Sequence, residues 1–296
     1  MDDDKILVSI RCLVYNHEPY LRQCLEGFVM QKTNFRFEAI VHDDASTDNS
    51  VAIIREYAEK YPDIIKPIYE TENQYSKHDG SLGRIMNAAC KGKYIALCEG
   101  DDYWIDPLKL QKQVDFMESH PDYSMCFHRA KIKNEIKAYT GCKYDFIEDK
   151  DYTANELFKD WLVPTASMLF RKEIIYNNKT DKRIQSGDII FVLRCVEAGK
   201  VRGFKEYMSV YRVQNTGLTY NKEYLRERIN GYVAHLDFVK EEFPFLKKSL
   251  LKNEYKKAYW RRFNLFPNLP DFIECFKLDP LFCIKKSVSK VLKTLI

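Results

Sequence analysis

The first third of the chain alternates between short apolar runs and longer segments whose apolar residues recur at helical spacing. Residues 5–14 and 36–42 are rich in β-branched residues, as buried strands are, and a third short strand is expected near 64–69. Residues 20–31 and 49–60 place apolar side chains three and four positions apart, as amphipathic helices do. This order of strand, helix, strand, helix and strand predicts a parallel sheet with helices on its faces.

The same alternation continues towards the middle of the chain. Further strands are predicted at 92–98, near 123–128 and near 166–171, and further helices at 82–90, at 107–119 and near 187–198. Pro107 occupies the first turn of its helix, where the N–H that it lacks would have no partner anyway. The expected fold class is therefore α/β, with a mixed, mainly parallel sheet flanked by helices.

The character of the chain changes near residue 216, after which charged and aromatic helical segments predominate. Residues 216–296 carry 16 Lys and Arg against 9 Asp and Glu, a net charge of +7, and since the whole chain carries +4, residues 1–215 carry −3. In the last segment, 284–296, lysines lie opposite an apolar face made of Ile284, Val288, Val291, Leu292 and Leu295. Such a helix indicates peripheral contact with an anionic membrane surface. The alternative is a helix packed on the protein with its lysines in water.

The composition favours some classes of protein and argues against others. The chain has 296 residues, 45% of them hydrophobic and 30% charged, which suits a large core and a soluble surface. No dense basic patch with a recognition motif occurs, so no nucleic-acid partner is expected. The nine cysteines form no CxxC pair, and we see neither a signal peptide nor an apolar run of about 20 residues. We therefore expect reduced thiols and a cytoplasmic protein, peripheral at most on the inner face of the cell membrane.

Two acidic pairs directly follow predicted strands. Asp43 and Asp44 end the second strand, and Asp101 and Asp102 follow the strand at 92–98. In a parallel sheet these positions lie at the carboxyl edge, where ligands bind. Carboxylates there can accept hydrogen bonds from a nucleoside, and adjacent carboxylates repel each other unless a hard cation such as Mg²⁺ or Mn²⁺ binds them. For both pairs the alternative is capping of the helix that follows.

Three segments, in this order and at this spacing, resemble the family 2 glycosyltransferases. They are VSIRCLVYNHEPYL at 8–21, VHDDASTD at 41–48 and GKYIALCEGDDYW at 92–104. Members of that family are inverting enzymes with a GT-A fold, a Rossmann-like α/β domain, and are common in bacterial polysaccharide and lipopolysaccharide assembly. The resemblance covers about residues 5–215. It implies a GT-A glycosyltransferase domain at 1–215 and a membrane- or acceptor-associated helical extension at 216–296.

The resemblance also implies roles for single residues. The nucleotide-sugar-binding residues are Tyr15, Asn16, Glu18, Asp43, Asp44, Arg84 and Asp101. The ligands of Mn²⁺ or Mg²⁺ are Asp101 and Asp102. Glu99 stands where the strict family motif has Asp, and Gln214 stands where relatives often carry a metal-binding His, so a third ligand stays open. For Arg84 the alternative is a solvated helix face.

Asp188, in the segment SGDIIF at 186–191, resembles the general base of the family. An inverting transfer needs one carboxylate to remove the proton of the acceptor hydroxyl while its oxygen attacks C1. The metal neutralises the departing diphosphate, so no acid is needed. The alternative for Asp188 is capping of a helix at 189–198. Trp161 and residues 163–167 are expected either to border the acceptor or to pack in the core, and Trp104 is expected to pack.

The expected function is transfer of a sugar from a UDP-sugar to a glycan or lipid-linked acceptor in cell-surface polysaccharide synthesis. Two alternatives belong to other classes. A sugar nucleotidyltransferase needs a Gly-rich phosphate loop after the first strand, and residues 15–18 contain no glycine. A non-catalytic nucleotide-sugar-binding module has no need of acids at all three predicted sites.

Overall fold

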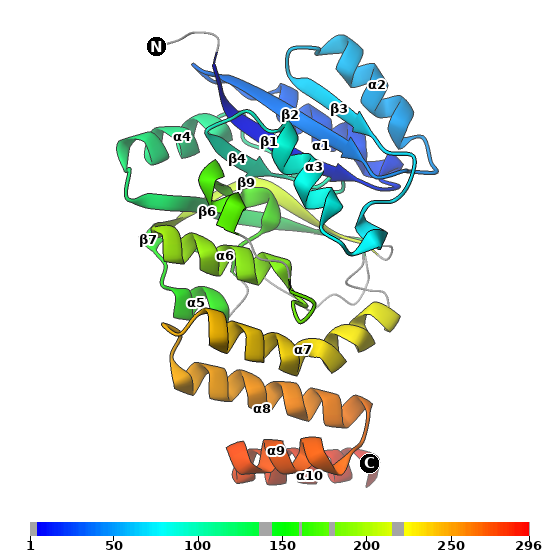
Figure 1. The fold of residues 1–296 in the computed structure, drawn as a ribbon, viewed down its shortest axis with the longest axis vertical. Helices are drawn as coiled ribbons and strands as arrows, with labels where there is room; N and C mark the ends of the chain where they lie inside the picture. The colour runs from blue at the N-terminus through cyan, green and yellow to red at the C-terminus, as the bar shows by residue number, and fades with distance from the viewer. Residues whose placement is uncertain (1–4, 136–143, 160–161, 178–180, 215–221, 296) are drawn as a thin grey trace. The chain divides into compact units, whose positions relative to one another are not determined.

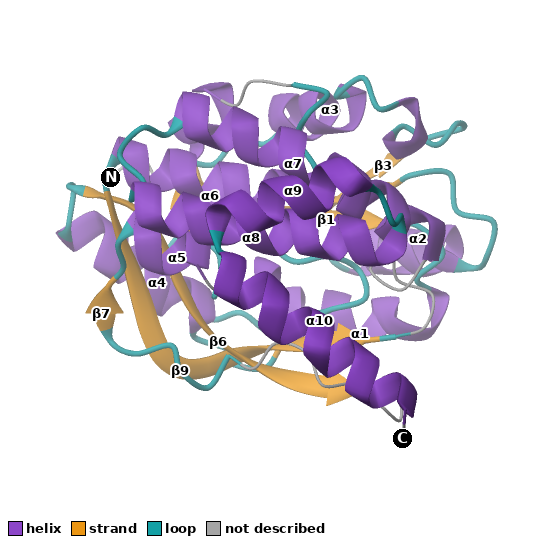
Figure 2. Cartoon of the chain, turned by 90° about the horizontal axis from the view of Figure 1, so that it is seen from below, coloured by secondary structure: helices purple, strands orange, loops and turns teal. Residues whose placement is uncertain are grey.

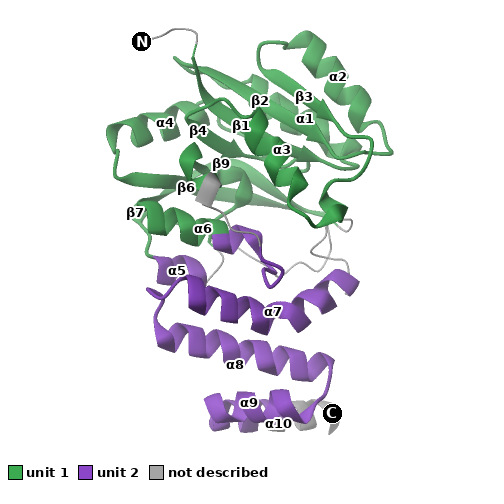
Figure 3. Ribbon diagram, viewed as in Figure 1, with its two compact units in different colours: residues 1–153, 160–179, 191–214 green, residues 154–159, 180–190, 215–296 purple. Residues whose placement is uncertain are grey.

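The structure, a computed structural model, describes residues 5–135, 144–159, 162–177, 181–214 and 222–295. The chain forms two compact units, which Figure 3 distinguishes by colour. Unit 1 consists of Met1–Thr153, Asp160–Lys179 and Phe191–Gln214, and unit 2 of Ala154–Lys159, Thr180–Ile190 and Asn215–Ile296. The assignment of a catalytic domain to 1–215 and of an associated extension to 216–296 stays a prediction.

Unit 1 is built on one mixed sheet, which has nine strands within the described residues (Figure 1). Their spatial order is β3 (Ile65–Tyr69), β2 (Arg36–Asp43), β1 (Ile6–Val14), β4 (Tyr94–Leu97), β8 (Leu169–Arg171), β6 (Tyr123–Asn134), β9 (Lys200–Val213) and β5 (Tyr103–Trp104), with β7 (Lys150–Asp151) beside β9. The parallel pairs are long, whereas each antiparallel pair joins only two or three residues. The prediction of a mixed, mainly parallel sheet is confirmed.

Helices cover both faces of this sheet (Figure 1). On one face lie α1 (Glu18–Val29), α2 (Ser50–Lys60) and α4 (Lys109–Ser119), which share a buried cluster with alternate residues of β1 such as Val8 and Ile10. On the other lie α3 (Ser81–Ala89) and α6 (Gly187–Ala198), whose Phe191 ring is 4.5 Å from that of Phe170 on β8. Because both faces are covered, the central strands are apolar on both sides, and this explains their continuous apolar runs.

The carboxyl ends of β1, β2 and β4 lie at one edge of the sheet. Val14 pairs with Asp43 where β1 and β2 end. Beyond the strands, the backbone N–H of Asp44 donates to the carbonyl of Val14 at 2.8 Å, and that of Gly100 donates to the carbonyl of Leu13 at 2.9 Å. Parallel pairing thus brings both acidic pairs to the same edge, as expected for a ligand site.

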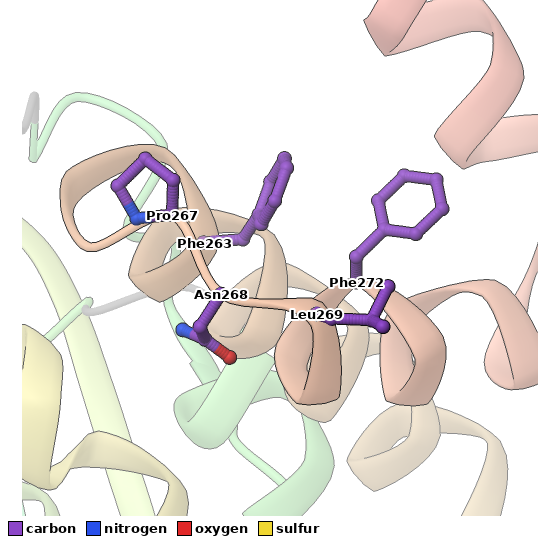
Figure 4. A pocket seen from close by; sticks show the side chains of 5 residues that line it. All are labelled: Phe263, Pro267, Asn268, Leu269 and Phe272. Carbon is purple, nitrogen blue, oxygen red and sulfur yellow. The ribbon is translucent and has the colours of Figure 1, made fainter.

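Unit 2 is helical. It holds α5 (Ala154–Lys159), the first residues of α6, and then α7 (Lys222–Glu242), α8 (Lys248–Leu265), α9 (Leu269–Leu278) and α10 (Pro280–Leu295), which are seen from below in Figure 2. Arg262 Nε on α8 donates to Asp271 Oδ2 on α9 at 2.8 Å. An apolar pocket of 380 Å³ lies where α8 turns into α9, lined by Phe263, Pro267, Asn268, Leu269 and Phe272 (Figure 4). The expected helical C-terminal extension is confirmed.

The C-terminal helix α10 contains the predicted segment 284–296. At its start Leu281 and Ile284 are 69% and 51% exposed, whereas Cys283 is buried. The side chains of Val288, Val291, Leu292 and Leu295 lie outside the described residues. Within the described part of the chain, each helix is too short or too polar to cross a membrane. Contact with a membrane surface therefore stays a prediction.

β1 and the segment before β4 lie so close together that a single added methyl group should destabilise the fold. A Cβ on Gly92 would lie 2.4 Å from the backbone nitrogen of Ser9, so Gly92→Ala must push these segments apart. We expect it to lower the free energy of unfolding, measured in urea, by about 3 kcal/mol. Gly83→Ala in α3 is the control, because a Cβ there meets nothing within 4 Å and alanine favours a helix. Equal effects of the two substitutions would contradict this account.

Candidate active site

The loop after β1 is locked to the loop after β2. Asn16 has a φ of 56°, in the left-handed region that asparagine tolerates, and its Oδ1 accepts from the Thr47 backbone N–H at 2.7 Å. Glu18 Oε1 accepts from Asn49 Nδ2 at 2.7 Å. Asn16 and Glu18 therefore hold the two loops together, while Tyr15 is 48% exposed beside them.

Asp43 and Asp44 are both buried, but their oxygens are used differently. Asp44 accepts from two backbone N–H groups, that of Gln74 at 2.6 Å and that of Tyr75 at 3.0 Å. Asp43 Oδ2 accepts from the Ser46 N–H at 3.0 Å, whereas its Oδ1 is buried and has no hydrogen-bond partner in the described chain. A buried carboxylate oxygen without a donor is costly, so Asp43 offers a ready acceptor for a ligand.

Helix capping does not explain either acidic pair. Asp48, not Asp43 or Asp44, accepts from the first backbone N–H of α2, that of Ser50, at 2.9 Å. Ahead of α4, Asp106 Oδ1 accepts from the Leu108 N–H at 2.8 Å. The two capping alternatives are therefore wrong for the pairs themselves.

Asp101 and Asp102 lie at the end of β4 in different surroundings. Asp102 is buried, and its Oδ1 accepts from the Arg212 backbone N–H at 2.8 Å. Burial, with the neighbouring charge of Asp101, raises the pKa of Asp102 well above its ordinary value. Asp101 is less buried, and its Oδ2 accepts from Gln214 Nε2 at 2.7 Å. Gln214 is thus hydrogen-bonded to Asp101, which the resemblance to family 2 glycosyltransferases identifies as a metal ligand.

Arg212 on β9 holds this acidic loop in place. It is buried, and its Nε donates to the Asp101 carbonyl at 2.8 Å. One terminal nitrogen donates to Glu135 Oε1 and the other to Gln23 Oε1, both at 2.9 Å. Its guanidinium carbon lies 4.6 Å from the centre of the Tyr20 ring. Sequence analysis missed this residue, although a lone arginine within an otherwise apolar strand end was a signal for it.

His17 is a second residue that sequence analysis set aside. Its Nδ1 is buried without a partner in the described residues, and it would lie 2.7 Å from a Cβ on Gly100. Burial lowers its pKa, against the opposing charges of Asp101, Asp48 and Asp43 in that order. His17 therefore lies among the carboxylates of both pairs. Its place in the segment Tyr15–Glu18 was the available signal.

The donor set fits a divalent cation that takes part of its coordination from a substrate. Asp101 and Asp102 supply hard oxygens, and a cation would offset the burial and the repulsion from Asp101 that together raise the pKa of Asp102. No three His, Cys, Asp or Glu side chains of the described residues are placed to hold a metal ion together. Mg²⁺ and Mn²⁺ suit such an incomplete site, because they are often bound by one or two carboxylates, waters and substrate phosphates.

Two of the predicted site residues, Arg84 and Asp188, interact with residues away from the two acidic pairs. Arg84 on α3 is exposed, and its terminal nitrogen donates to the Asp79 carbonyl at 2.7 Å, which agrees with a solvated helix face. Asp188 lies in the first turn of α6, in unit 2, and not ahead of a helix at 189. Its side chain reaches solvent, yet the surrounding protein raises its pKa, partly opposed by the positive charge of Arg228. The assigned roles of both stay predictions.

The structure tests the prediction for Trp104 and part of the prediction for residues 163–167. Trp104 is 2% exposed, and its Nε1 donates to the Ala166 carbonyl at 2.8 Å, so its interpretation as a packing residue is confirmed. Val163 and Ala166 are also buried, as core packing requires. Trp161 lies outside the described residues.

The fold and the edge site together define a GT-A type α/β protein, and comparison with known proteins identifies its family. The family model described as glycosyl transferase family 2 matches residues 9–178, more than half of the chain. The chain belongs to this family. An uncharacterised protein of Mycobacterium tuberculosis is 34% identical over 235 residues, which cover 78% of this chain and 67% of that protein. TuaG of Bacillus subtilis, a putative teichuronic acid biosynthesis glycosyltransferase, is 25% identical over 263 residues, 87% of this chain and 99% of TuaG.

Solved structures show the same fold. Staphylococcus aureus TarS superposes with a TM-score of 0.65 and 16% identity over 92% of this chain, and the chain spans about half (48%) of TarS. A shorter form of TarS was solved with UDP-GlcNAc. The mannosyltransferase PcManGT of Pyrobaculum calidifontis, solved with GDP-Man and Mn²⁺, has a TM-score of 0.59 and 16% identity over 96% of this chain and 81% of its own. At these identities the likeness concerns the fold alone.

The network around Arg212 predicts that its loss affects both stability and the site. Arg212→Met keeps much of the stem but leaves Glu135 and the Asp101 carbonyl without their donor. We expect the free energy of unfolding to fall by about 3 kcal/mol. Mn²⁺ binding, measured calorimetrically with UDP present, should weaken by about tenfold or more, because the Arg212 side chain holds the backbone of the loop that carries both carboxylates.

Arg202→Met is the matched control, since Arg202 lies on the same strand and pairs with Asp151 at 3.2 Å in a more exposed setting. It should cost about 1 kcal/mol or less and leave Mn²⁺ binding unchanged. Equal Mn²⁺ binding by Arg212→Met and the unaltered protein would contradict the positioning role.

Proposed function

We propose that this protein transfers a sugar, with inversion, from a UDP-sugar to a glycan or lipid-linked acceptor in cell-surface polysaccharide synthesis. The observation that carries the proposal is the paired carboxylates Asp101 and Asp102 at the carboxyl edge of a family 2 fold. TuaG is named for teichuronic acid biosynthesis, which supports a role in polysaccharide synthesis, and the TarS and PcManGT complexes with UDP-GlcNAc and GDP-Man support a nucleotide-sugar donor. The TarS complexes with UDP and with UDP-GlcNAc support a UDP-sugar as the donor.

In this proposal the edge loops bind the donor. Asp43 Oδ1, buried and without a donor in the described chain, accepts a hydrogen bond from the nucleoside. Asp101 and Asp102 hold a divalent cation, which when bound supplies positive charge for the leaving diphosphate. Arg212 and Gln214 orient these carboxylates through the bonds described above. None of these residues needs to move a proton.

Asp188 is the proposed base. It removes the proton of the acceptor hydroxyl while the oxygen forms a bond to C1 of the sugar, and the bond from C1 to the nucleoside diphosphate breaks on the opposite face. A carboxylate with a raised pKa is a stronger base than an ordinary one. Inversion follows from this single displacement.

Release of nucleotide from a panel of UDP-, GDP- and dTDP-sugars, with Mn²⁺, Mg²⁺ or EDTA, tests the donor and metal proposals. We expect slow release from one UDP-sugar that requires a metal, and a loss of about 100-fold or more in Asp101→Asn. Asp79→Asn, at an exposed position paired with Arg84, should keep full activity. No release and no binding of any nucleotide-sugar by folded protein would overturn the transferase proposal.

The raised pKa of Asp188 predicts the pH dependence of transfer. The base must be ionised, so kcat should fall as pH falls through the raised pKa of Asp188 and level off above it. Asp188→Asn should lower transfer by about 10²–10⁴-fold while nucleotide binding, measured separately, is retained. A variant that transfers sugar with the normal pH profile would exclude Asp188 as the base.

A further inference from the structure

One face of α7 packs on the segment that carries Asp188. A Cβ on Gly231 would lie 2.7 Å from the side chain of Gln185, and His235 Nδ1 accepts from the Gln185 backbone N–H at 3.4 Å. Residues 228, 231 and 235 recur at spacings of three and four, so they share this face of the helix. All of these residues belong to unit 2, together with the first turn of α6 (Figure 3).

Arg228 lies at the N-terminal end of this face. It is partly buried, and its guanidinium carbon lies 5.7 Å from the centre of the Tyr224 ring. The other arginines of unit 2 with comparable burial hold carboxylates: Arg183 pairs with Glu241 at 2.8 Å, and Arg262 with Asp271. Arg228 therefore keeps a full positive charge near Asp188 without a hydrogen-bonded anion in the described chain.

His235, on the same face, adds a second donor. Burial, with the charge of Arg228, lowers the pKa of His235 to about 4, so the ring is neutral at physiological pH. Because Nδ1 accepts from Gln185, the proton of the neutral ring is on Nε2. That Nε2 is buried and lacks an acceptor among the described residues. Beside the proposed base, this face thus offers a buried hydrogen-bond donor and one cation, and no side chain of the described residues forms an ion pair with that cation.

We propose that Arg228 binds an oxyanion of the acceptor, a carboxylate or a phosphate, and so presents a neighbouring hydroxyl to Asp188. This inference rests on the proposed role of Asp188 and names the acceptor class as an anionic glycan or glycosyl phosphate. A guanidinium binds either anion through two parallel hydrogen bonds, which fixes orientation as well as affinity. A neutral acceptor would leave this partly desolvated charge unpaired.

Binding of an anion also has an electrostatic consequence for the base. The charge of Arg228 lowers the pKa of Asp188, and an anion paired with Arg228 would cancel that effect. Asp188 would therefore become more basic when an anionic acceptor occupies the site. The arrangement favours proton removal from the correct acceptor over proton removal from water.

Three probes that differ only at C6 test the proposal directly. They are methyl β-glucoside, methyl β-glucuronide and methyl β-glucoside 6-phosphate, with binding to the full-length protein measured by ligand-observed NMR titration. We expect at least one anionic probe to bind about tenfold more tightly than the neutral one. Arg228→Gln should abolish this preference, and Arg228→Lys should restore part of it. Arg226→Gln is the matched control, since Arg226 is exposed and two residues away on another face of α7.

The preferred anion, carboxylate or phosphate, identifies the acceptor chemistry. Equal binding of all three probes, or a preference that persists in Arg228→Gln, would overturn the inference. The titrations need no catalysis, so the two proposals can fail separately. Protein that binds an anionic probe through Arg228 but releases no nucleotide from any donor would sink the transferase proposal alone.

Discussion

The repulsion between Asp101 and Asp102 is the constraint around which the edge of unit 1 is organised. Asp102 is buried next to the half-buried Asp101, and burial of one carboxylate beside another needs compensation, which comes from a distant part of the chain. Arg212, more than a hundred residues later, donates from its backbone to one acid and from its side chain to the carbonyl of the other. Its remaining nitrogens reach Glu135 and Gln23, so β9, β6 and α1 all meet at this point. β5 begins directly after the acids and pairs with the part of β9 that precedes Arg212.

Much of the sheet could be predicted because its information is local. Apolar runs and helical spacing located β1, β2, β3 and β4 with the helices between them, and parallel pairing then implied a common edge for both acidic pairs. The roles of Arg212 and His17 could not be predicted in this way. Arg212 acts through the long parallel pairing of β6 with β9, which joins segments some seventy to eighty residues apart and leaves no periodic signal. The surroundings of His17 are set only in the folded chain, where β1 and β4 place it against Gly100.

Capping and ligand binding draw on the same residue types, which is why sequence alone left both open at the acidic pairs. The structure separates them by position: Asp48 accepts from the first N–H group of α2, and Asp106 accepts from the N–H group of Leu108, the residue before α4. The pairs closer to the strands accept from neither group. The same distinction applies among the residues predicted to bind the nucleotide-sugar. Asn16 and Glu18 cross-link two loops, whereas Asp43 keeps an uncommitted oxygen. Some residues of a binding motif can therefore affect a ligand indirectly, by holding the loop that contacts it.

The bonds of Asp44 bear on the energetics of ligand exchange. Its two oxygens accept from the backbone N–H groups of Gln74 and Tyr75, one bond to each oxygen. A carboxylate oxygen can accept two hydrogen bonds, so a nucleoside could bind Asp44 without displacing either N–H group. The bonds from the chain fix the direction of the carboxylate before a ligand arrives, so less rotational freedom would be lost on binding. Occupancy of Asp44 and order in residues 74–75 would then be thermodynamically linked, each increasing the other.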